Sequence, residues 1–238
     1  DLISRLIPFS ISSSSPAMGT RFWRFSALIM RSFLYRYIRT RLAPGLLWLC
    51  LALAAQAEEP GILVLGDSIS AAYGMSLEEG WVALLAQRLE EYRVINASIS
   101  GETSEGALRR LPELLQQHNP RWVIIELGGN DGLRGYPISR FRDNLETMVT
   151  LSREKGAGVI LLPMEIPPNY GARYTRDFRD SYTLVAQQTG ALVAPFILEG
   201  IATNPELMQA DGIHPAATAQ PMMLQRVLPT VMQALEAS

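Results

Sequence analysis

The chain has 238 residues, of which 48% are apolar and 18% are charged, a balance typical of a globular protein with a full core and not of a disordered chain. The charge is uneven: residues 1–57 hold seven Arg and one Asp, a net charge of +6, while residues 58–238 hold 14 basic and 22 acidic residues, a net charge of −8. An acidic main part argues against a nucleic-acid-binding protein, which would need a basic surface.

The segment from residue 30 to residue 57 has the three parts of a secretory signal peptide. "MRSFLYRYIRTR" is an Arg-rich start, "LAPGLLWLCLALAA" is a short apolar run, and "AQA" before "EE" is a cleavage site. The apolar run is shorter than the roughly 20 residues that a membrane span needs. We therefore predict cleavage after Ala57 and a periplasmic or secreted protein without a stable membrane anchor.

The predicted signal peptide separates two further parts of the chain, residues 1–29 before it and residues 58–238 after it. Residues 1–29 are rich in Ser and Arg and are interpreted as an upstream extension or a mis-set start, with an organelle transit peptide as the alternative. Residues 58–238 are predicted to form one domain. The single cysteine, Cys50, lies in the signal peptide and follows Leu49 instead of a small residue, so we expect no lipid anchor. The domain itself contains no cysteine for a disulfide, a thiolate metal site or a Cys nucleophile.

From residue 61 onward, short apolar runs alternate with longer amphipathic stretches, the pattern of repeated βα units around a parallel sheet. The predicted strands span residues 62–66, 93–98, 122–127, 158–164 and 191–196. The predicted helices span residues 80–91, 104–118, 138–155, 173–189 and 217–235, and Pro112 should kink or offset the second. Near-continuous Val, Ile and Leu suits strands covered on both faces. The expected fold is a three-layer α/β/α sandwich with a five-stranded parallel sheet.

Polar, Gly-rich clusters follow the predicted strands. They are "GDS" (66–68), "SGETS" (100–104), "GGND" (128–131) and "MEIPPNYG" (164–171), while "DGIHP" (211–215) precedes the last helix. In open parallel sheets, ligands bind outside the carboxyl ends of the strands, so these segments should converge there.

Ser68 in "GDS" is a candidate nucleophile, because a serine hydroxyl attacks acyl groups when a histidine takes its proton. His214 is available at the same edge of the sheet, and Asp211 can accept a hydrogen bond from its other ring nitrogen and hold the tautomer. The alternative for Ser68 is a helix N-cap, a common role of serine. The other histidine, His118, ends a predicted helix and is expected at the surface.

Donors for a developing oxyanion are also available at two strand ends. Gly101 lets the backbone approach closely, and Asn130 can offer a side-chain amide, with Gly128 and Gly129 leaving space around it. The alternative for all four is turn chemistry, which favours the same residue types.

Metal and nucleotide sites are not indicated. Two separated histidines and one D-x-x-H do not supply the ligands that zinc prefers, and neither G-x-x-x-x-G-K-[ST] nor G-x-G-x-x-G occurs. The esterase elbow G-x-S-x-G is absent too, since Ser70 stands two places after Ser68. We expect neither a metal nor a cofactor.

The combination of "GDS", Gly101, "GGND" and "DGIH", in this order, resembles the SGNH/GDSL hydrolase family over residues 61–236. "ELGGNDGLRG", "PPNYGARY" and "NPELMQADGIHP" resemble its bacterial periplasmic thioesterase/lysophospholipase/arylesterase branch. Ile69 departs from the Leu of the older GDSL name, an apolar exchange that should leave the chemistry unchanged.

The resemblance implies a role for each matching residue. Ser68 would be the nucleophile, His214 the general base and then acid, and Asp211 its orienting partner. The oxyanion hole would comprise the backbone N–H groups of Ser68 and Gly101 with the side chain of Asn130. The aspartates of "GDS" and "GGND", Asp67 and Asp131, would organise their loops without a catalytic part.

The resemblance further implies a flavodoxin-like fold, no cofactor, and hydrolysis of acyl esters and thioesters with broad specificity. We expect a small-molecule acyl ester or thioester as substrate, with lysophospholipids among the candidates, and a monomer. Apolar residues beside the expected triad, Leu133, Tyr136 and Ile166, are the candidates for an acyl pocket. Two alternatives stay open. A carbohydrate O-deacetylase would share the triad, and a non-catalytic α/β domain could use the same loops to bind an anion at helix N-termini.

Overall fold

The computed structural model of the protein describes residues 60–237. The predicted extension (1–29) and the predicted signal peptide (30–57) lie outside the described residues, so both stay predictions. Within residues 60–237, no helix is long and apolar enough to cross a membrane.

A five-stranded sheet forms the centre of the described domain. Its strands are β1 (Gly61–Gly66), β2 (Arg93–Asn96), β3 (Trp122–Glu126), β4 (Gly158–Leu161) and β5 (Leu192–Val193). All pairings are parallel, and the strand order is β2-β1-β3-β4-β5. The predicted α/β sandwich with five parallel strands is confirmed. β5 is much shorter than the predicted 191–196, because it lies at the edge and pairs only with β4.

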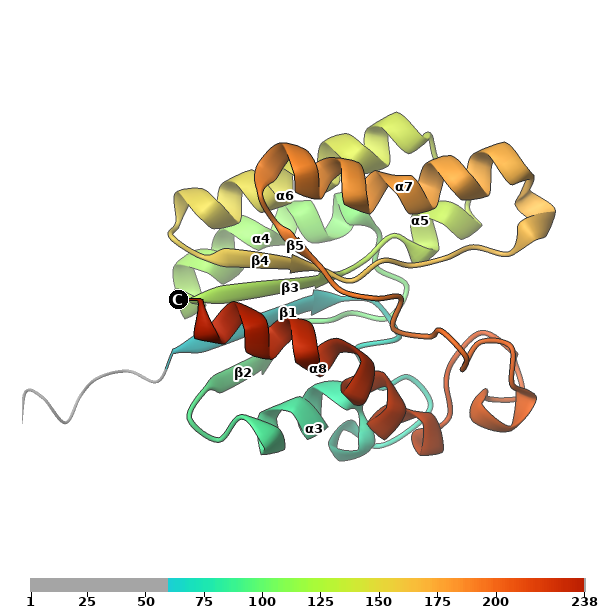
Figure 1. Ribbon diagram of the computed structural model, residues 1–238, viewed down its shortest axis with the longest axis horizontal. Coiled ribbons are helices and arrows are strands. Elements are labelled where there is room, and N and C mark those ends of the chain that lie inside the picture. Colours follow the sequence, from blue (N-terminus) through green and yellow to red (C-terminus); the bar gives the residue numbers. More distant parts are fainter. Residues whose placement is uncertain (1–59, 238) are drawn as a thin grey trace, which may run out of the picture. The chain divides into compact units, whose positions relative to one another are not determined.

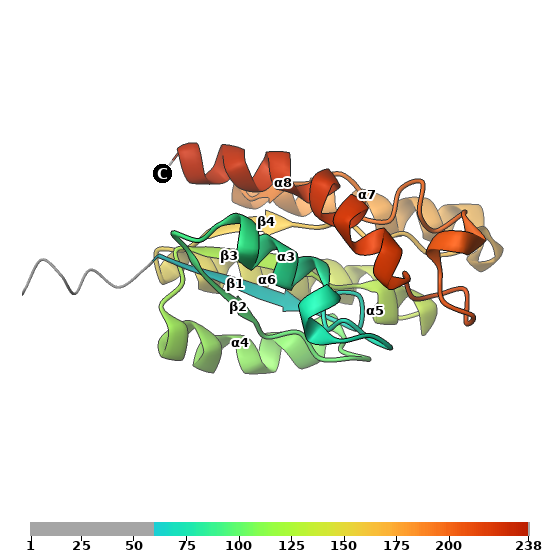
Figure 2. The same ribbon diagram turned by 90° about the horizontal axis from the view of Figure 1, so that it is seen from below.

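Helices cover both faces of this sheet, as Figures 1 and 2 show from two directions. One face carries α3 (Trp81–Arg88) and α8 (Gln220–Glu236). The other carries α4 (Ser104–His118), α6 (Ile138–Glu154) and α7 (Ala172–Thr189). This arrangement explains the apolar strands: both faces of the sheet are buried by helices.

Two local features bear on the predicted helices. Pro112 lies inside α4, which continues on both sides of it because a proline removes only one backbone bond and buried residues on either side hold the helix against the sheet; a kink at Pro112 stays a prediction. The last helix begins at Gln220 instead of residue 217, after a separate 3-10 turn (Ala217–Ala219), and has a proline in its first turn. Gly129 and Asn130, for which turn chemistry was the alternative, lie in a short helix, α5 (Gly129–Leu133).

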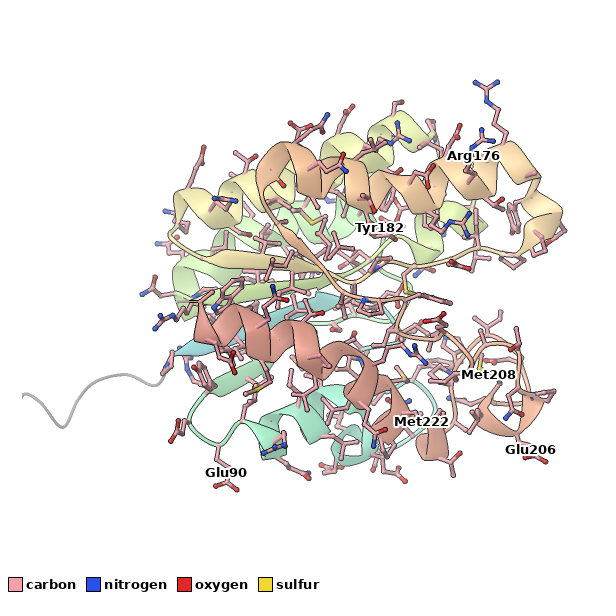
Figure 3. The ribbon with its side chains drawn as sticks, viewed as in Figure 1. Glu90, Arg176, Tyr182, Glu206, Met208 and Met222 are labelled. Atoms are coloured by element: carbon pink, nitrogen blue, oxygen red, sulfur yellow. The ribbon has the colours of Figure 1, made fainter. Side chains whose placement is uncertain are left out.

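An aromatic cluster supports the segment that leads into α5. Phe141 and Phe178 stack with ring centroids 5.0 Å apart, and the buried Tyr182 hydroxyl donates a hydrogen bond to the Leu127 carbonyl at 2.8 Å. Figure 3 shows Tyr182 on α7, directed toward the sheet. A Cβ atom at Gly128 would lie 2.5 Å from the Tyr182 hydroxyl. Gly128 therefore serves close packing against the core, not the space around Asn130 that the sequence suggested.

Candidate active site

The strand order places the candidate site at a topological switch point. Chain connections leave β1 and β3 toward opposite faces of the sheet, and in such folds ligands bind outside the carboxyl ends of these strands. "GDS" follows β1 and "GGND" follows β3. In Figure 1 the strands point toward α5 and toward the orange segment that follows β5, which carries "DGIHP".

Ser68 and His214 are 146 residues apart in the chain and adjacent in space. The distance between Ser68 Oγ and His214 Nε2 is 2.9 Å. The residues after Ser68 form turns instead of an α-helix, so the N-cap alternative does not describe this serine. The first turn is held by Asp67, whose Oδ1 accepts from the Ile69 N–H at 3.0 Å.

The "DGIHP" loop fixes the imidazole through a single aspartate. Asp211 Oδ1 accepts hydrogen bonds from the backbone N–H groups of Ile213 (2.9 Å) and His214 (3.0 Å), and its Oδ2 lies 2.7 Å from His214 Nδ1. The His214 backbone and ring, followed by the Ile213 backbone, lower the pKa of Asp211 well below its usual value. Ionised Asp211 can only accept, so Nδ1 of His214 carries a proton. In the neutral ring Nε2 is then the acceptor that faces the Ser68 hydroxyl.

Two of the three candidate oxyanion donors, Gly101 and Asn130, lie on different elements: Gly101 is in the loop after β2, and Asn130 is in α5. Gly101 has φ +78°, a conformation that favours glycine, and the side on which a Cβ atom would lie is open, with no neighbour within 4 Å, while its carbonyl accepts a hydrogen bond from Arg134 Nη2 at 3.2 Å. Asn130 is the second residue of α5, and its Nδ2 donates to Asp67 Oδ2 at 3.1 Å. An amide nitrogen carries two hydrogens, so one remains for a ligand.

Three buried carboxyl groups lie beneath this edge of the sheet. Burial raises the pKa of Asp67 to about 6 and also raises the pKa of Asp131. Glu126 is fully buried, and burial followed by the nearby Asp67 charge raises its pKa far above the usual value. Asp67 and Glu126 therefore do not both carry a negative charge readily at neutral pH.

Each of these carboxyl groups ties loops together. Glu126 Oε2 accepts from the Ser70 hydroxyl at 2.7 Å and from the Asp67 N–H at 3.3 Å. Asp131 accepts from the Ser104 hydroxyl at 2.6 Å and the Ser104 N–H at 2.9 Å, and so joins α5 to the start of α4. Glu126 was not among the predicted site residues, although a charged residue inside the apolar run "WVIIEL" could have marked it.

The predicted pocket residues lie in two neighbouring segments. Leu133 is exposed and Tyr136 is partly buried, whereas Ile166 is buried, with its Cγ2 2.4 Å from where a Gly132 Cβ would be. The Tyr170 hydroxyl donates to the Leu133 carbonyl at 2.8 Å, and the Tyr174 hydroxyl donates to the Tyr136 carbonyl at 2.7 Å. The end of α5 and the loop after it are thus tied to the 3-10 turn Pro168–Tyr170 and to the start of α7.

His118 ends α4, on the side of the sheet away from the strands' carboxyl ends, and takes no part in this cluster. Among residues 60–237, no group of three or more His, Cys, Asp or Glu side chains is arranged to hold a metal ion.

This chain is similar to known esterases and acylhydrolases both in its sequence and in its structure. Residues 64–220 match the model of the GDSL-like Lipase/Acylhydrolase family. "Esterase TesA" of Pseudomonas aeruginosa is 50% identical over 198 residues, which cover 82% of this chain and 98% of that protein. "Thioesterase 1/protease 1/lysophospholipase L1" of Escherichia coli K12 is 42% identical over 178 residues, covering 74% of this chain and 86% of that protein.

Among solved structures, the psychrotrophic esterase EstA from Pseudoalteromonas sp., inhibited by monoethylphosphonate, superposes with a TM-score of 0.72. It is 45% identical and covers 74% of this chain and 98% of its own.

Proposed function

We propose that this chain cleaves acyl esters and thioesters through an acyl-enzyme formed on Ser68. The premise is that the chain belongs to the GDSL-like lipase/acylhydrolase family and is a carboxylic ester hydrolase. The observation that carries this proposal is the chain of contacts from Ser68 Oγ through His214 to Asp211, at 2.9 and 2.7 Å. The esterase and thioesterase names of its relatives support both substrate classes.

In the first half of the proposed reaction, His214 Nε2 removes the proton of the Ser68 hydroxyl while Oγ attacks the acyl carbonyl carbon. The tetrahedral intermediate collapses when the resulting imidazolium returns that proton to the leaving alkoxide or thiolate. In the second half, His214 removes a proton from water as the water attacks the acyl-Ser68 ester, and the carboxylic acid leaves when the imidazolium returns that proton to Ser68 Oγ. Asp211 stays ionised and stabilises the imidazolium.

The proposed oxyanion hole combines the backbone N–H groups of Ser68 and Gly101 with the Asn130 amide. Asp67 supports this assignment, because its ionised carboxylate only accepts and therefore requires the NH₂ end of Asn130 to face it. The second hydrogen of that nitrogen is available for the carbonyl oxygen of the substrate.

Asn130→Ala is expected to lower kcat by about 10²–10³, as loss of one oxyanion donor typically does, while the melting temperature stays near that of the wild type. A turn residue would show the opposite, a loss of roughly 1 kcal/mol or less in stability with kcat nearly intact. Asn130→Asp should be at least as harmful, because it places a second carboxyl against Asp67 and brings negative charge to the oxyanion site. Measuring kcat, KM and thermal unfolding of both variants decides, and a normal kcat in the Asp variant would remove Asn130 from the oxyanion hole.

We assign the acyl chain to the surface around Leu133, Tyr136 and Ile166. Leu133→Ala and Tyr136→Ala should lower kcat/KM for decanoyl esters about five- to tenfold, about 1 kcal/mol of lost apolar contact, and leave acetyl esters unaffected. Ile166 requires the milder Ile166→Val, because truncating a buried isoleucine to Ala costs about 2–5 kcal/mol of stability. Leu184→Ala is the control: its exposed fraction, 39%, matches the 37% of Leu133, and it lies on α7. Equal losses for both chain lengths would place the pocket elsewhere.

Substrate class is tested with a panel of p-nitrophenyl esters, acyl-CoAs, lysophospholipids and acetylated sugars. Preference for long acyl esters and acyl-CoAs supports the proposal. Activity confined to acetylated sugars would select the O-deacetylase alternative, which has the same triad. The non-catalytic binding domain is ruled out as a description of this chain by its membership of a hydrolase family.

We propose that the protein is exported and that its signal peptide, residues 30–57, is cleaved after Ala57. Mass spectrometry of the exported protein should find Glu58 as its first residue, and a retained apolar run would contradict cleavage.

A monomer stays the prediction for the oligomeric state, to be checked by light scattering.

A further inference from the structure

The segment that carries Asp211 and His214 contains little regular structure. Between β5 and α8 it forms two 3-10 turns (Pro205–Leu207 and Ala217–Ala219), and Figure 1 shows it extending beyond the sheet edge in orange and red. Figure 3 labels two of its side chains, Glu206 and Met208. A misplacement of about 1 Å can cost about 10² in rate, so a base on such a loop needs a specific anchor.

Hydrogen bonds within the loop preserve its shape. Met208 and Pro215 form an isolated antiparallel bridge, the Gln209 N–H donates to the His214 carbonyl at 2.8 Å, and the Ala216 N–H donates to the Leu207 carbonyl at 2.7 Å. These bonds make the loop a unit, but they do not fix its position relative to Ser68.

The side chain of Gln209 makes that connection. Its Nε2 donates to the Tyr73 carbonyl at 2.7 Å and to the Pro215 carbonyl at 3.1 Å. Both hydrogens of the amide nitrogen are thus used, one on the residue after His214 and one on the turn that follows Ser68. That turn is itself closed by the Tyr73 N–H, which donates to the Ser68 carbonyl at 3.2 Å.

Two further features of the turn fit this connection. A Cβ atom at Gly74 would lie 2.3 Å from Gln209 Oε1, so the amide has room because residue 74 has no side chain. The Tyr73 ring lies against the His214 ring, with centroids 4.3 Å apart and planes at 34°. The same turn therefore contacts both the amide of Gln209 and one face of the imidazole.

We propose that Gln209 is a positioning residue that locks the His214 loop to the Ser68 turn and so keeps His214 Nε2 within reach of Ser68 Oγ. This inference rests on the proposed function, in which His214 is the base. The amide is suited to the task because one nitrogen donates to two carbonyl groups. A glutamate of the same size has no hydrogen to offer when ionised and would face both carbonyl oxygens with negative charge.

The test compares Gln209→Ala, the similarly sized Gln209→Glu, and the control Glu206→Ala, an exposed residue three positions earlier in the same loop. We expect both Gln209 variants to lower kcat by up to about 10²-fold, with KM for a short ester little changed and the rate of Ser68 labelling by a fluorophosphonate reduced in parallel. Glu206→Ala should match the wild type in all three measurements. Normal kcat in both Gln209 variants would overturn the inference.

A double-mutant cycle with His214→Ala separates positioning from general structural damage. If Gln209 acts through His214, Gln209→Ala should not lower the residual activity of His214→Ala any further. An equal fold-loss in both backgrounds would overturn the inference and assign Gln209 to the fold. The proposed function fails by a different result, full activity of the His214→Ala single variant.

Discussion

Ser68→Ala is expected to abolish ester and thioester hydrolysis, with a fall in kcat of about 10⁶, the loss seen when a serine nucleophile or its base is removed. His214→Ala should cost about as much, and the double variant should lose little more, because the two side chains act as one unit. A fluorophosphonate should label the wild-type protein at Ser68. The measurements are kcat on a p-nitrophenyl ester and mass spectrometry of the labelled peptide.

The fold should survive this change. Ser68 is only partly buried, so removing its hydroxyl leaves no cavity, and thermal unfolding of the variant should resemble that of the wild type. Ser139→Ala, at an exposed serine on α6, is the control and should keep both activity and labelling. Labelling at a serine other than Ser68, or full activity of Ser68→Ala, would disprove the mechanism.

Asp211→Asn is expected to lower kcat by about 10⁴ while the loop keeps its shape. The two oxygens of Asp211 have separate tasks: Oδ1 accepts the two backbone bonds, and Oδ2 faces His214 Nδ1. Asparagine can keep the first with its carbonyl oxygen, but it turns an N–H toward the ring. Nδ1 then becomes the acceptor, and the proton moves to Nε2, where the Ser68 proton should go.

Asp211→Ala serves as the comparison, because it removes the loop bonds together with the orienting contact. If the tautomer argument is correct, the Asn variant loses activity at an unchanged melting temperature, and NMR of the imidazole N–H detects the proton on Nε2. Near-normal kcat in Asp211→Asn would show that Asp211 has only a structural role in the loop.

The pattern of apolar runs was sufficient to predict the sheet and the place of the site. Continuous Val, Ile and Leu marks strands buried on both faces, and the carboxyl ends of parallel strands share one edge. For that reason the sequence alone predicts that "GDS" and "GGND" lie together, and it links "DGIHP" to them because His214 is the histidine available at that edge. The short spacing between Asp211 and His214 is local, so the sequence alone also indicated their partnership.

The contacts that support these residues were decided by the tertiary structure. Glu126 lies 56 residues from Ser70, Asn130 lies 63 from Asp67, and Gln209 lies 136 from Tyr73, yet each pair is joined by a hydrogen bond. Local patterns carry no information about such pairs, since propensity and periodicity describe neighbours within a few residues. Burial likewise arises only when helices cover the sheet. It is burial that keeps Glu126 away from water and raises its pKa, although the same residue type would be an ordinary charged group on the surface.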